Sequence, residues 1–192
     1  MNCFIVVDFE ATCDKNERLA RSKMEIIEIG AIKLRIEDFT IVDKFQSFVK
    51  PVRTPVLTEF CKDLTGIKQT DLSTAPTFYD AIEQFFYWSW LNSNTVAWAS
   101  WSMYDFYQLK QDCEHFYVDN EYDCIEHFNL KNMYGDAHGG RRRGIKNALY
   151  EQSLDFEGSH HRALDDALNA TKIITSMPLF KRNLNKLLME LV

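Results

Sequence analysis

The sequence predicts a layered α/β domain. Three observations favour this class. First, short apolar runs rich in β-branched residues open the chain. Second, strand-like and helix-like segments mix along the chain after them. Third, 46% of the 192 residues are hydrophobic and 26% are charged, which is typical of a globular protein. A chain of this length corresponds to about one domain with a short appendage, and it is long enough to bury a full core.

The first predicted strand is residues 4–7, an apolar run that ends at Asp8. Because every position in it is apolar, we expect a central strand that is buried on both faces and has a parallel neighbour. Residues 25–34 are rich in isoleucine and predict a second strand. Residues 41–49, stopped by proline, predict a third strand that pairs with the second as a hairpin, and residues 95–99 predict a further short strand.

Helices are predicted from capping residues and from apolar residues at helical spacing. Thr58 is suited to cap a short helix that Gly66 ends, and Thr77 followed by Asp80 resembles a capping box. The predicted helices are residues 58–64, a helix that opens at Thr77, a helix that carries Phe106 and Phe116, and residues 144–152, 162–176 and 181–192.

We expect one domain over residues 1–179 and an amphipathic helical tail over residues 180–192. The leucine-lined face of the tail could pack on the domain or on a partner. Residues 12–22 are polar and charged, which predicts a loop. The chain contains no repeat and no low-complexity stretch.

The composition argues against several classes of protein. No apolar run approaches the roughly 20 residues of a membrane span, and the N-terminus lacks the basic flank of a signal peptide, so we expect a cytoplasmic protein that does not bind membranes. The five cysteines are widely spread without a C-x-x-C pair, which indicates reduced thiols. The net charge of −6 gives no bulk attraction to nucleic acid, unless the acids gather at a metal site where cations offset them.

Asp8 and Glu10 lie two residues apart at the end of the first predicted strand. The period of a strand places both carboxylates on the same face. Burying carboxylates at the end of a buried strand costs free energy unless they meet a cation or strong hydrogen-bond donors. The alternative is that the strand simply surfaces here into a polar loop.

Two further acids lie beside predicted element ends. Asp105 follows a strand and precedes a helix, where it could also be a plain N-cap. Asp166 lies in the first turns of a predicted helix, five residues after His161, so the two side chains can converge on one point. For the adjacent Asp165 we favour the role of a first-turn acid that is stabilised by the helix dipole.

Four separated acids and one histidine are the residue types that a two-metal phosphodiesterase uses. Two divalent cations about 3.5–4 Å apart clamp a phosphate and stabilise both the attacking and the departing oxygen. Hard cations such as Mg²⁺ prefer carboxylate oxygens and water. A histidine that is neutral near pH 7 can take the proton of the attacking water.

The chain resembles the DEDD superfamily of 3′–5′ exonucleases, in its DEDDh branch, over about residues 3–179. Residues 7–12 (Val-Asp-Phe-Glu-Ala-Thr) match the motif D-x-E-[AT]-T, residues 98–105 match the second motif, and residues 161–166 match H-x₄-D. Residues 101–105 depart from the Gly and Asp that often precede Tyr-Asp in bacterial relatives. The segments that most resemble the subgroup of histone-mRNA and small-RNA exonucleases and their bacterial relatives are residues 25–31, 48–51, 60–67, 111–113 and 160–166.

This resemblance implies an RNase H-like exonuclease fold, with a central mixed β-sheet flanked by helices. It also implies two bound Mg²⁺ or Mn²⁺ ions, with Asp8 serving both and Asp105 acting partly through water. It assigns His161 as the general base and His160 as a neighbour. The metal ligands it implies are Asp8, Glu10, Asp105 and Asp166, and the groups implied to hold the terminal nucleotide are the backbone of Phe9 and Ala11 and the side chains of Thr12, Leu64, Thr65 and Ile67.

We therefore expect a metal-dependent 3′–5′ exonuclease that trims single strands of RNA, DNA or both to nucleoside 5′-monophosphates. Two alternatives stay open. The first is a non-catalytic nucleic-acid-binding protein on the same fold, although the complete set of acids speaks against it. The second is a phosphodiesterase that trims only oligonucleotides. The sequence does not choose between RNA and DNA, and it does not give the oligomeric state.

Two surface signals are ambiguous. The basic run of residues 141–143, with Lys146, could hold the phosphate backbone of an incoming strand or could be a solvated loop. Trp98, Trp101 and Tyr104 could stack on bases, but core packing is the expectation for these three side chains.

The pairs Cys113-x-His115 and Cys124-x-x-His127 offer nitrogen and sulfur groups. Their spacing is not that of a standard zinc finger, and the first pair lies on a predicted helix. We therefore do not expect these residues to bind zinc.

Overall fold

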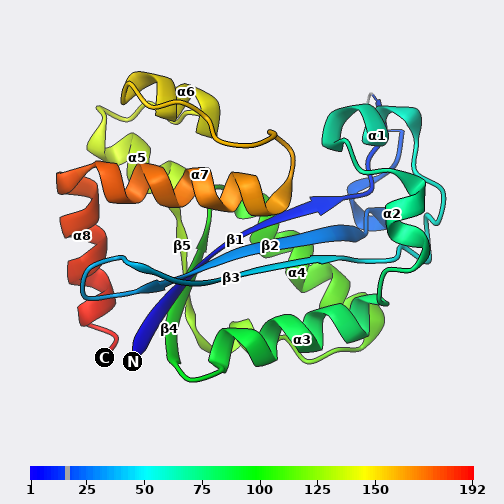
Figure 1. The fold of residues 1–192 in the computed structure, drawn as a ribbon, viewed down its shortest axis with the longest axis horizontal. Helices are drawn as coiled ribbons and strands as arrows, with labels where there is room; N and C mark the ends of the chain where they lie inside the picture. The colour runs from blue at the N-terminus through cyan, green and yellow to red at the C-terminus, as the bar shows by residue number, and fades with distance from the viewer. Residues whose placement is uncertain (16–17) are drawn as a thin grey trace.

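The computed structural model describes residues 1–15 and 18–192; residues 16 and 17, inside the predicted loop 12–22, lie outside the described residues. Within the described part of the chain, the strands form one mixed sheet in the order β3-β2-β1-β4-β5 (Figure 1). Their bounds are β1 Asn2–Ala11, β2 Ile26–Arg35, β3 Ile41–Phe48, β4 Asn94–Ser100 and β5 Glu126–Asn129.

The first strand is central, as predicted from its uniform apolarity. β1 pairs antiparallel with β2 on one side and parallel with β4 on the other, and β2 and β3 form the predicted hairpin. β5 pairs parallel with β4 but was not predicted, because its four residues, Glu-His-Phe-Asn, carry neither an apolar run nor an alternation.

Helices cover both faces of the sheet, so the predicted class, an α/β fold with helices flanking a mixed sheet, is confirmed (Figure 1). α7 lies across β1 and β2 on one face, while α3 and α4 lie on the other. The helices are α1 Glu59–Thr65, α2 Gln69–Ser73, α3 Phe78–Trp90, α4 Met103–Phe116, α5 Leu130–Ala137, α6 Ile145–Glu151, α7 Ala163–Ser176 and α8 Pro178–Met189, with short 3₁₀ turns η2 Arg21–Lys23 and η3 Glu121–Cys124.

The predicted capping residues start two of these helices. The Thr58 hydroxyl accepts a hydrogen bond from the Cys61 N–H, and Gly66 ends α1 in the left-handed conformation with φ of 69°. The Thr77 hydroxyl caps α3 by accepting from the Asp80 N–H. These local bonds satisfy N–H groups that a helix start otherwise leaves without partners.

The core has one layer on each face of the sheet, because side chains alternate along β1. Phe4 and Val6 pack with α7 and α8, and Ile5 and Val7 pack with α3 and α4. The last helix begins at Pro178, three residues before the predicted start, because proline suits the first helical position. Its buried side chains are Phe180, Leu184 and Leu188, so this helix packs on the domain.

The cysteine side chains are free thiols in the described residues, as expected. The helices that the structure describes include none long and apolar enough to cross a membrane.

Candidate active site

The first two acids lie at the carboxyl end of β1. Asp8 and Glu10 are two residues apart and point to the same cleft, as the strand period predicts. Across the antiparallel pair, Asp8 lies opposite Gly30 of β2, and Glu10 lies opposite Glu28. The Glu10 side chain is largely enclosed, with 8% of the residue exposed.

Asp105 approaches the same strand from α4. It is the third residue of the helix, and the cap is the hydroxyl of Ser102, so the alternative that Asp105 is a plain N-cap does not hold. Its Oδ1 accepts a hydrogen bond of 3.1 Å from the backbone N–H of Phe9, between the two β1 acids. This bond ties the start of α4 to the residue between Asp8 and Glu10.

Asp166 reaches the site from the first turn of α7. Its Oδ2 accepts a hydrogen bond of 2.9 Å from the His161 N–H, while its Oδ1 is buried without a hydrogen-bond partner in the described residues. The neighbouring Asp165 turns away and accepts from the Ser159 N–H at 2.7 Å. Asp165 therefore orders the loop before α7, which fits the first-turn role predicted for it.

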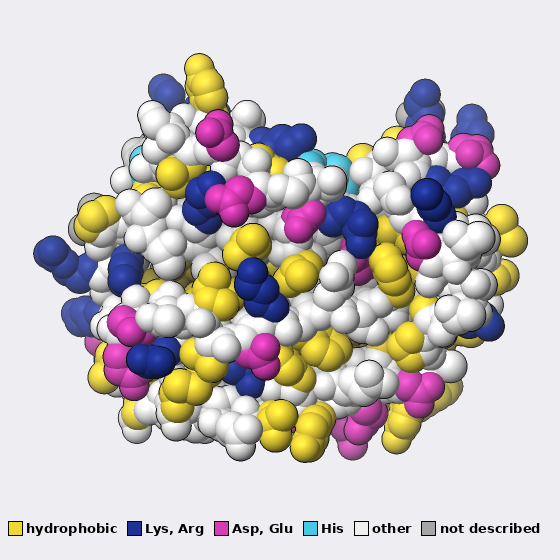
Figure 2. Space-filling view, in the orientation of Figure 1, with side chains coloured by type: hydrophobic (Ala, Val, Ile, Leu, Met, Phe, Trp, Pro, Cys, Tyr) yellow, Lys and Arg dark blue, Asp and Glu magenta, His cyan; other side chains and the backbone are white. Residues whose placement is uncertain are grey.

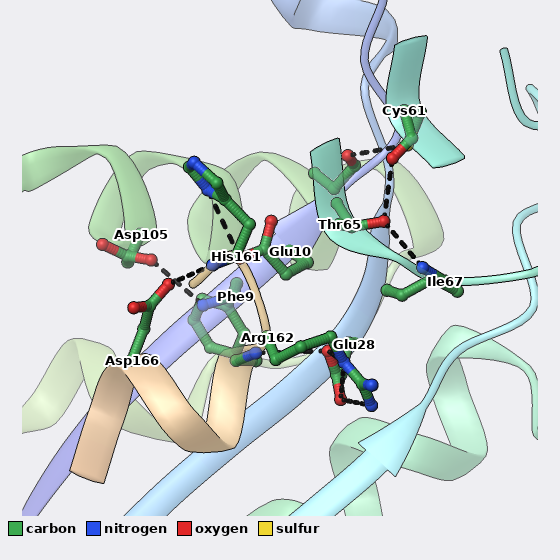
Figure 3. A network of polar contacts seen from close by, with 12 residues as sticks. Phe9, Glu10, Glu28, Cys61, Thr65, Ile67, Asp105, His161, Arg162 and Asp166 are labelled. Atoms are coloured by element: carbon green, nitrogen blue, oxygen red, sulfur yellow. Dashed lines mark hydrogen bonds and ion pairs between the residues drawn. The ribbon is translucent and has the colours of Figure 1, made fainter. Parts of the chain in front are cut away.

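These acids converge on one cleft of about 330 Å³. One carboxylate oxygen each from Asp8, Glu10 and Asp166 lies within 4.8 Å of the others, and Asp105 lines the same cleft. Figure 2 shows the surface hollowed between α6 and α1, with histidine side chains at the floor. Figure 3 shows Glu10, Asp105 and Asp166 around the backbone of Phe9.

Burial raises the pKa of each of these carboxyls, and repulsion from neighbouring acids adds to it for Asp8, Glu10 and Asp166. Burial is the larger cause for Asp8, whose pKa rises well above its usual range, and the charges of Asp105 and Glu10 add to it. Burial and the charges of Asp166 and Glu28 raise the pKa of Glu10 to about 9. Burial raises the pKa of Asp105 and that of Asp166 to about 7. A bound cation would reverse this effect, because it favours the ionised form.

His161 stands beside these acids with one ring nitrogen, Nδ1, 4.0 Å from Oε1 of Glu10. Its backbone has φ of 64°, a conformation that residues other than glycine rarely adopt, and the bond from its N–H to Asp166 holds it there. Burial, with a smaller contribution from Lys146, lowers the pKa of His161. The ring is therefore neutral near pH 7 and can accept a proton.

The position of α7 depends on two β2 residues to which sequence analysis gave no role. A Cβ on Gly30 would lie 2.1 Å from the backbone carbonyl carbon of Ala163, so only glycine lets the helix start come down beside Asp8. Glu28, which is fully buried, accepts hydrogen bonds from the guanidinium of Arg162 and from the Ala163 N–H. The sequence did carry a signal for Glu28. It is a charged residue inside an isoleucine-rich predicted strand, and glutamate is rarely buried without a partner.

The residues expected to hold a terminal nucleotide divide into two groups. Phe9, Ala11 and Leu64 line the cleft. The other three are buried and are not among its lining residues. The Thr12 hydroxyl accepts a hydrogen bond from the Glu25 N–H, and the Thr65 hydroxyl donates to the Cys61 carbonyl at the end of α1. Ile67 packs in the core beside α1. Thr65, the last residue of α1, and Ile67, just after the Gly66 cap, are buried, whereas Leu64 is partly exposed and lines the cleft.

The aromatic residues near Asp105 are mainly core residues, as expected. Trp98 is buried, and Trp101 is buried at the cleft wall with its indole N–H donating to the Arg143 carbonyl at 2.9 Å. Tyr104 departs from the expectation of core packing, because it lines the cleft and is 36% exposed. In the basic run, Arg142 bonds to Asn132 and Arg143 to Glu151, which favours a structural role for these two.

No zinc cluster forms from the two Cys/His pairs in the residues that the structure describes. Cys113 is buried in the core, and Cys124 hydrogen-bonds to the Glu121 carbonyl. The Nε2 atom of His127 lies 3.0 Å from the Ser100 hydroxyl, with the ring against Trp98.

The donor set of the cleft suits hard divalent cations. Three converging carboxylates offer the oxygen ligands that Mg²⁺ and Mn²⁺ prefer. The Oδ1 atom of Asp166 has no partner although it is buried, and a buried carboxylate oxygen is costly unless a donor or a cation meets it. The residues present therefore fit a bound metal ion.

Comparisons with known proteins agree with this geometry. The chain is 29% identical to the 3′-5′ exonuclease eri1 of Schizosaccharomyces pombe, over 90% of this chain and 67% of that protein. It is 30% identical to ERI1 exoribonuclease 2 of Mus musculus, over 96% of this chain but only 30% of that protein. The chain thus spans about two thirds of the first relative and less than a third of the second.

A solved structure shares the fold. The nuclease domain of 3′hExo, a DEDDh family member bound to rAMP, matches with a TM-score of 0.83 at 26% identity, over 91% of this chain and 90% of that chain. The family model described as Exonuclease (RNase_T) matches residues 5–174, which include Asp8, Glu10, Asp105, His161 and Asp166. The chain belongs to this exonuclease family and has the RNase H-like fold of its DEDDh members.

Proposed function

We propose that this chain is a metal-dependent 3′–5′ exonuclease that releases nucleoside 5′-monophosphates from the 3′ end of single-stranded nucleic acid. One observation carries the proposal. Carboxylate oxygens of Asp8, Glu10 and Asp166 lie within 4.8 Å of one another, in a cleft that His161 also lines. Family membership supports the reaction class, and the names of relatives support the 3′–5′ direction.

Asp8, Glu10 and Asp166 would hold two Mg²⁺ or Mn²⁺ ions, with Asp105 contributing partly through water. When bound, these cations supply positive charge that stabilises the attacking and departing oxygens of the phosphodiester. Asp105 also keeps the backbone of Phe9 in place through its 3.1 Å hydrogen bond, and so fixes the spacing of the two β1 acids.

His161 would act as the general base. Its neutral ring accepts the proton of the attacking water, and the carboxylate of Glu10, 4.0 Å from Nδ1, stabilises the ring once it is protonated. The strained backbone of His161 is held by its N–H bond to Asp166, so the base and a metal ligand move together. His160 has no role in this scheme.

The cleft favours a strand end over a duplex. Its volume of about 330 Å³ lies at the low end of the range for small-ligand pockets, about 300–1,000 Å³. Leu64 from α1 and Tyr104 from α4 both line it and are partly exposed, which gives a terminal base apolar surfaces to contact. The relatives named exoribonucleases make RNA the first substrate to test.

The test is digestion of 5′-labelled RNA, DNA and RNA stem-loop of matched sequence, with Mg²⁺, with Mn²⁺ and with EDTA. We expect a ladder that shortens by one nucleotide at a time, needs the divalent cation, and is lost in Asp166→Asn. Binding of the strand without hydrolysis would instead support the non-catalytic alternative. Hydrolysis confined to very short oligomers would support the oligonucleotide-trimming alternative.

A further inference from the structure

His160 lines the cleft but takes no part in the proposed reaction. In the described residues its ring makes no hydrogen bond or ion pair. Its contacts are edge-on aromatic ones, with Phe156 at 5.5 Å and with His161 at 3.9 Å between ring centroids. An imidazole nitrogen without a partner, facing a cleft, is available to a ligand.

Two imidazoles and one carboxylate meet at this point. A ring nitrogen of His160, a ring nitrogen of His161 and a carboxylate oxygen of Asp166 lie within 4.8 Å of one another. Asp166 is only 4% exposed, and its Oδ1 is buried without a partner in the part of the chain that the structure describes. The two histidines belong to a loop fixed by the bonds from Ser159 N–H to Asp165 and from His161 N–H to Asp166, so they are ordered before any ligand arrives.

The ligand set of two imidazoles and one carboxylate is not the set that Mg²⁺ prefers. Zn²⁺ accepts histidine nitrogen at about 2.0–2.1 Å and carboxylate oxygen at a similar distance, commonly with three protein ligands and one open position. Tetrahedral zinc places its ligand atoms about 3.4 Å apart. The ligand atoms lie within 4.8 Å of one another, and both rings are partly exposed, so bound zinc would need to draw the two nitrogens only slightly closer to Asp166.

We propose that His160, His161 and Asp166 form an inhibitory site for Zn²⁺ and similar nitrogen-preferring cations, overlapping the site that hydrolyses the strand. Zinc bound there occupies a ring nitrogen of His161 and takes the free oxygen of Asp166 away from the catalytic cations. The binding half of this proposal stands by itself. The inhibitory half rests on the proposed function.

The binding test uses the metal-stripped, reduced full-length chain. Zn²⁺ affinity is measured by competition with a chromogenic chelator for the wild type, for His160→Gln, and for His115→Gln as a matched control outside the cleft. We expect His160→Gln to weaken the tightest zinc site by about tenfold or more, as loss of a metal-site partner does. His115→Gln should bind Zn²⁺ as tightly as the wild type does. Co²⁺ bound to the wild type and to His115→Gln should give the visible absorption bands of tetrahedral cobalt, and His160→Gln should lack them. Equal zinc affinity in the wild type and His160→Gln would overturn the site.

The inhibition test follows nucleotide release at saturating Mg²⁺ as Zn²⁺ is added. We expect His160→Gln to match wild-type activity without zinc and to need about tenfold more zinc for half inhibition, while His115→Gln shifts nothing. Zinc bound through His160 without inhibition would overturn the inhibitory half. A chain that binds zinc through His160 but releases no nucleotide with Mg²⁺ would overturn the proposed function and leave the zinc site standing.

Discussion

Asp8, Glu10 and Asp166 carry ionisable oxygens within 4.8 Å of one another, and burial, with repulsion from nearby acids, raises the pKa of each. A carboxyl whose folded pKa is raised binds its proton more tightly in the folded state than in the unfolded state. It therefore stabilises the fold fully below its unfolded pKa, and this contribution is lost as pH rises through the folded pKa. The pKa of His161 is lowered, so this residue makes stability rise with pH. That opposite effect is confined to pH values below the usual histidine pKa of 6.5.

The stability of the metal-free protein should consequently fall between pH 6.5 and 9. The pKa values of about 7 for Asp105 and Asp166 and about 9 for Glu10 set this window. Urea unfolding in EDTA at pH 6.5, 7.5 and 9 measures the fall. The isosteric variant Glu10→Gln should flatten the curve and raise Tm at pH 9 by about 2 °C or more, and Mg²⁺ should restore stability to the wild type. A wild-type stability that rises across this range would contradict the electrostatic account.

Replacement of His161 by asparagine should lower kcat by about 10²–10⁴-fold, because it removes the proton acceptor for the attacking water. KM should change little, since the carboxylates and the cleft walls stay in place. Steady-state kinetics on a single-stranded oligomer separates the two constants, with His160→Gln in zinc-free buffer as the control of unchanged rate. A rise in KM at constant kcat would show that His161 binds substrate and is not the base.

At the scale of elements, the geometry of the acid cleft depends on how closely α7 approaches β2. Gly30 makes room for the backbone of Ala163, and Glu28 fastens the helix start by binding Arg162 and the Ala163 N–H. Glu28 also lies opposite Glu10 across the strand pair, and the Arg162 guanidinium partly offsets the charge with which Glu28 repels Glu10. The sheet thus places both the strand acids and the helix acid.

Gly30→Ala should displace the start of α7. The added Cβ would lie 2.1 Å from backbone atoms of Ala163 and Leu164, which cannot rotate away as a side chain can. We expect a loss of about 1–3 kcal/mol in unfolding free energy, typical of overpacking, together with a large loss of activity because Asp166 moves from Asp8. Gly139→Ala, in an open loop with positive φ, is the control: its Cβ meets no neighbouring atom, so it should lose stability only through the strain of alanine at positive φ and should keep its activity. Wild-type activity in Gly30→Ala would refute this role.

Glu28→Ala should lower the free energy of unfolding by about 2 kcal/mol or more, because it leaves the Arg162 guanidinium and the buried N–H of Ala163 without their acceptor. The exposed pair of Glu59 and Lys62 provides the control, and Glu59→Ala should change stability by less than about 1 kcal/mol. Chemical denaturation compares the two variants. Equal losses would mean that the Glu28 pair acts as an ordinary surface ion pair.

On the scale of the whole molecule, the sheet brings together residues that are far apart in the chain. β1 supplies Asp8 and Glu10, α4 supplies Asp105 after β4, and α7 supplies Asp166. Because β4 runs parallel to β1, the start of α4 lies at the same edge of the sheet as the two β1 acids. One cleft therefore collects the motifs.

Sequence patterns predicted the central strand, the hairpin and the convergence of the acids, because apolar periodicity, capping residues and motif spacing are local signals. β5 escaped prediction because its pairing with β4 depends on tertiary context and not on its own composition. The roles of Gly30 and Glu28 escaped because both depend on contact with a helix more than a hundred residues later. The inward turn of Thr65 and Ile67 likewise follows from packing around Gly66, which spacing alone does not reveal.

The most direct test of the central claim measures nucleotide release as a function of Mg²⁺ concentration for the wild type and for Asp8→Asn, with folding monitored by circular dichroism. The account predicts that Asp8→Asn keeps the fold, with a Tm equal to or above that of the metal-free wild type. It also predicts a loss of about 10³-fold or more in rate at every Mg²⁺ concentration. Wild-type turnover in Asp8→Asn, or nucleotide release by the wild type in EDTA, would contradict it.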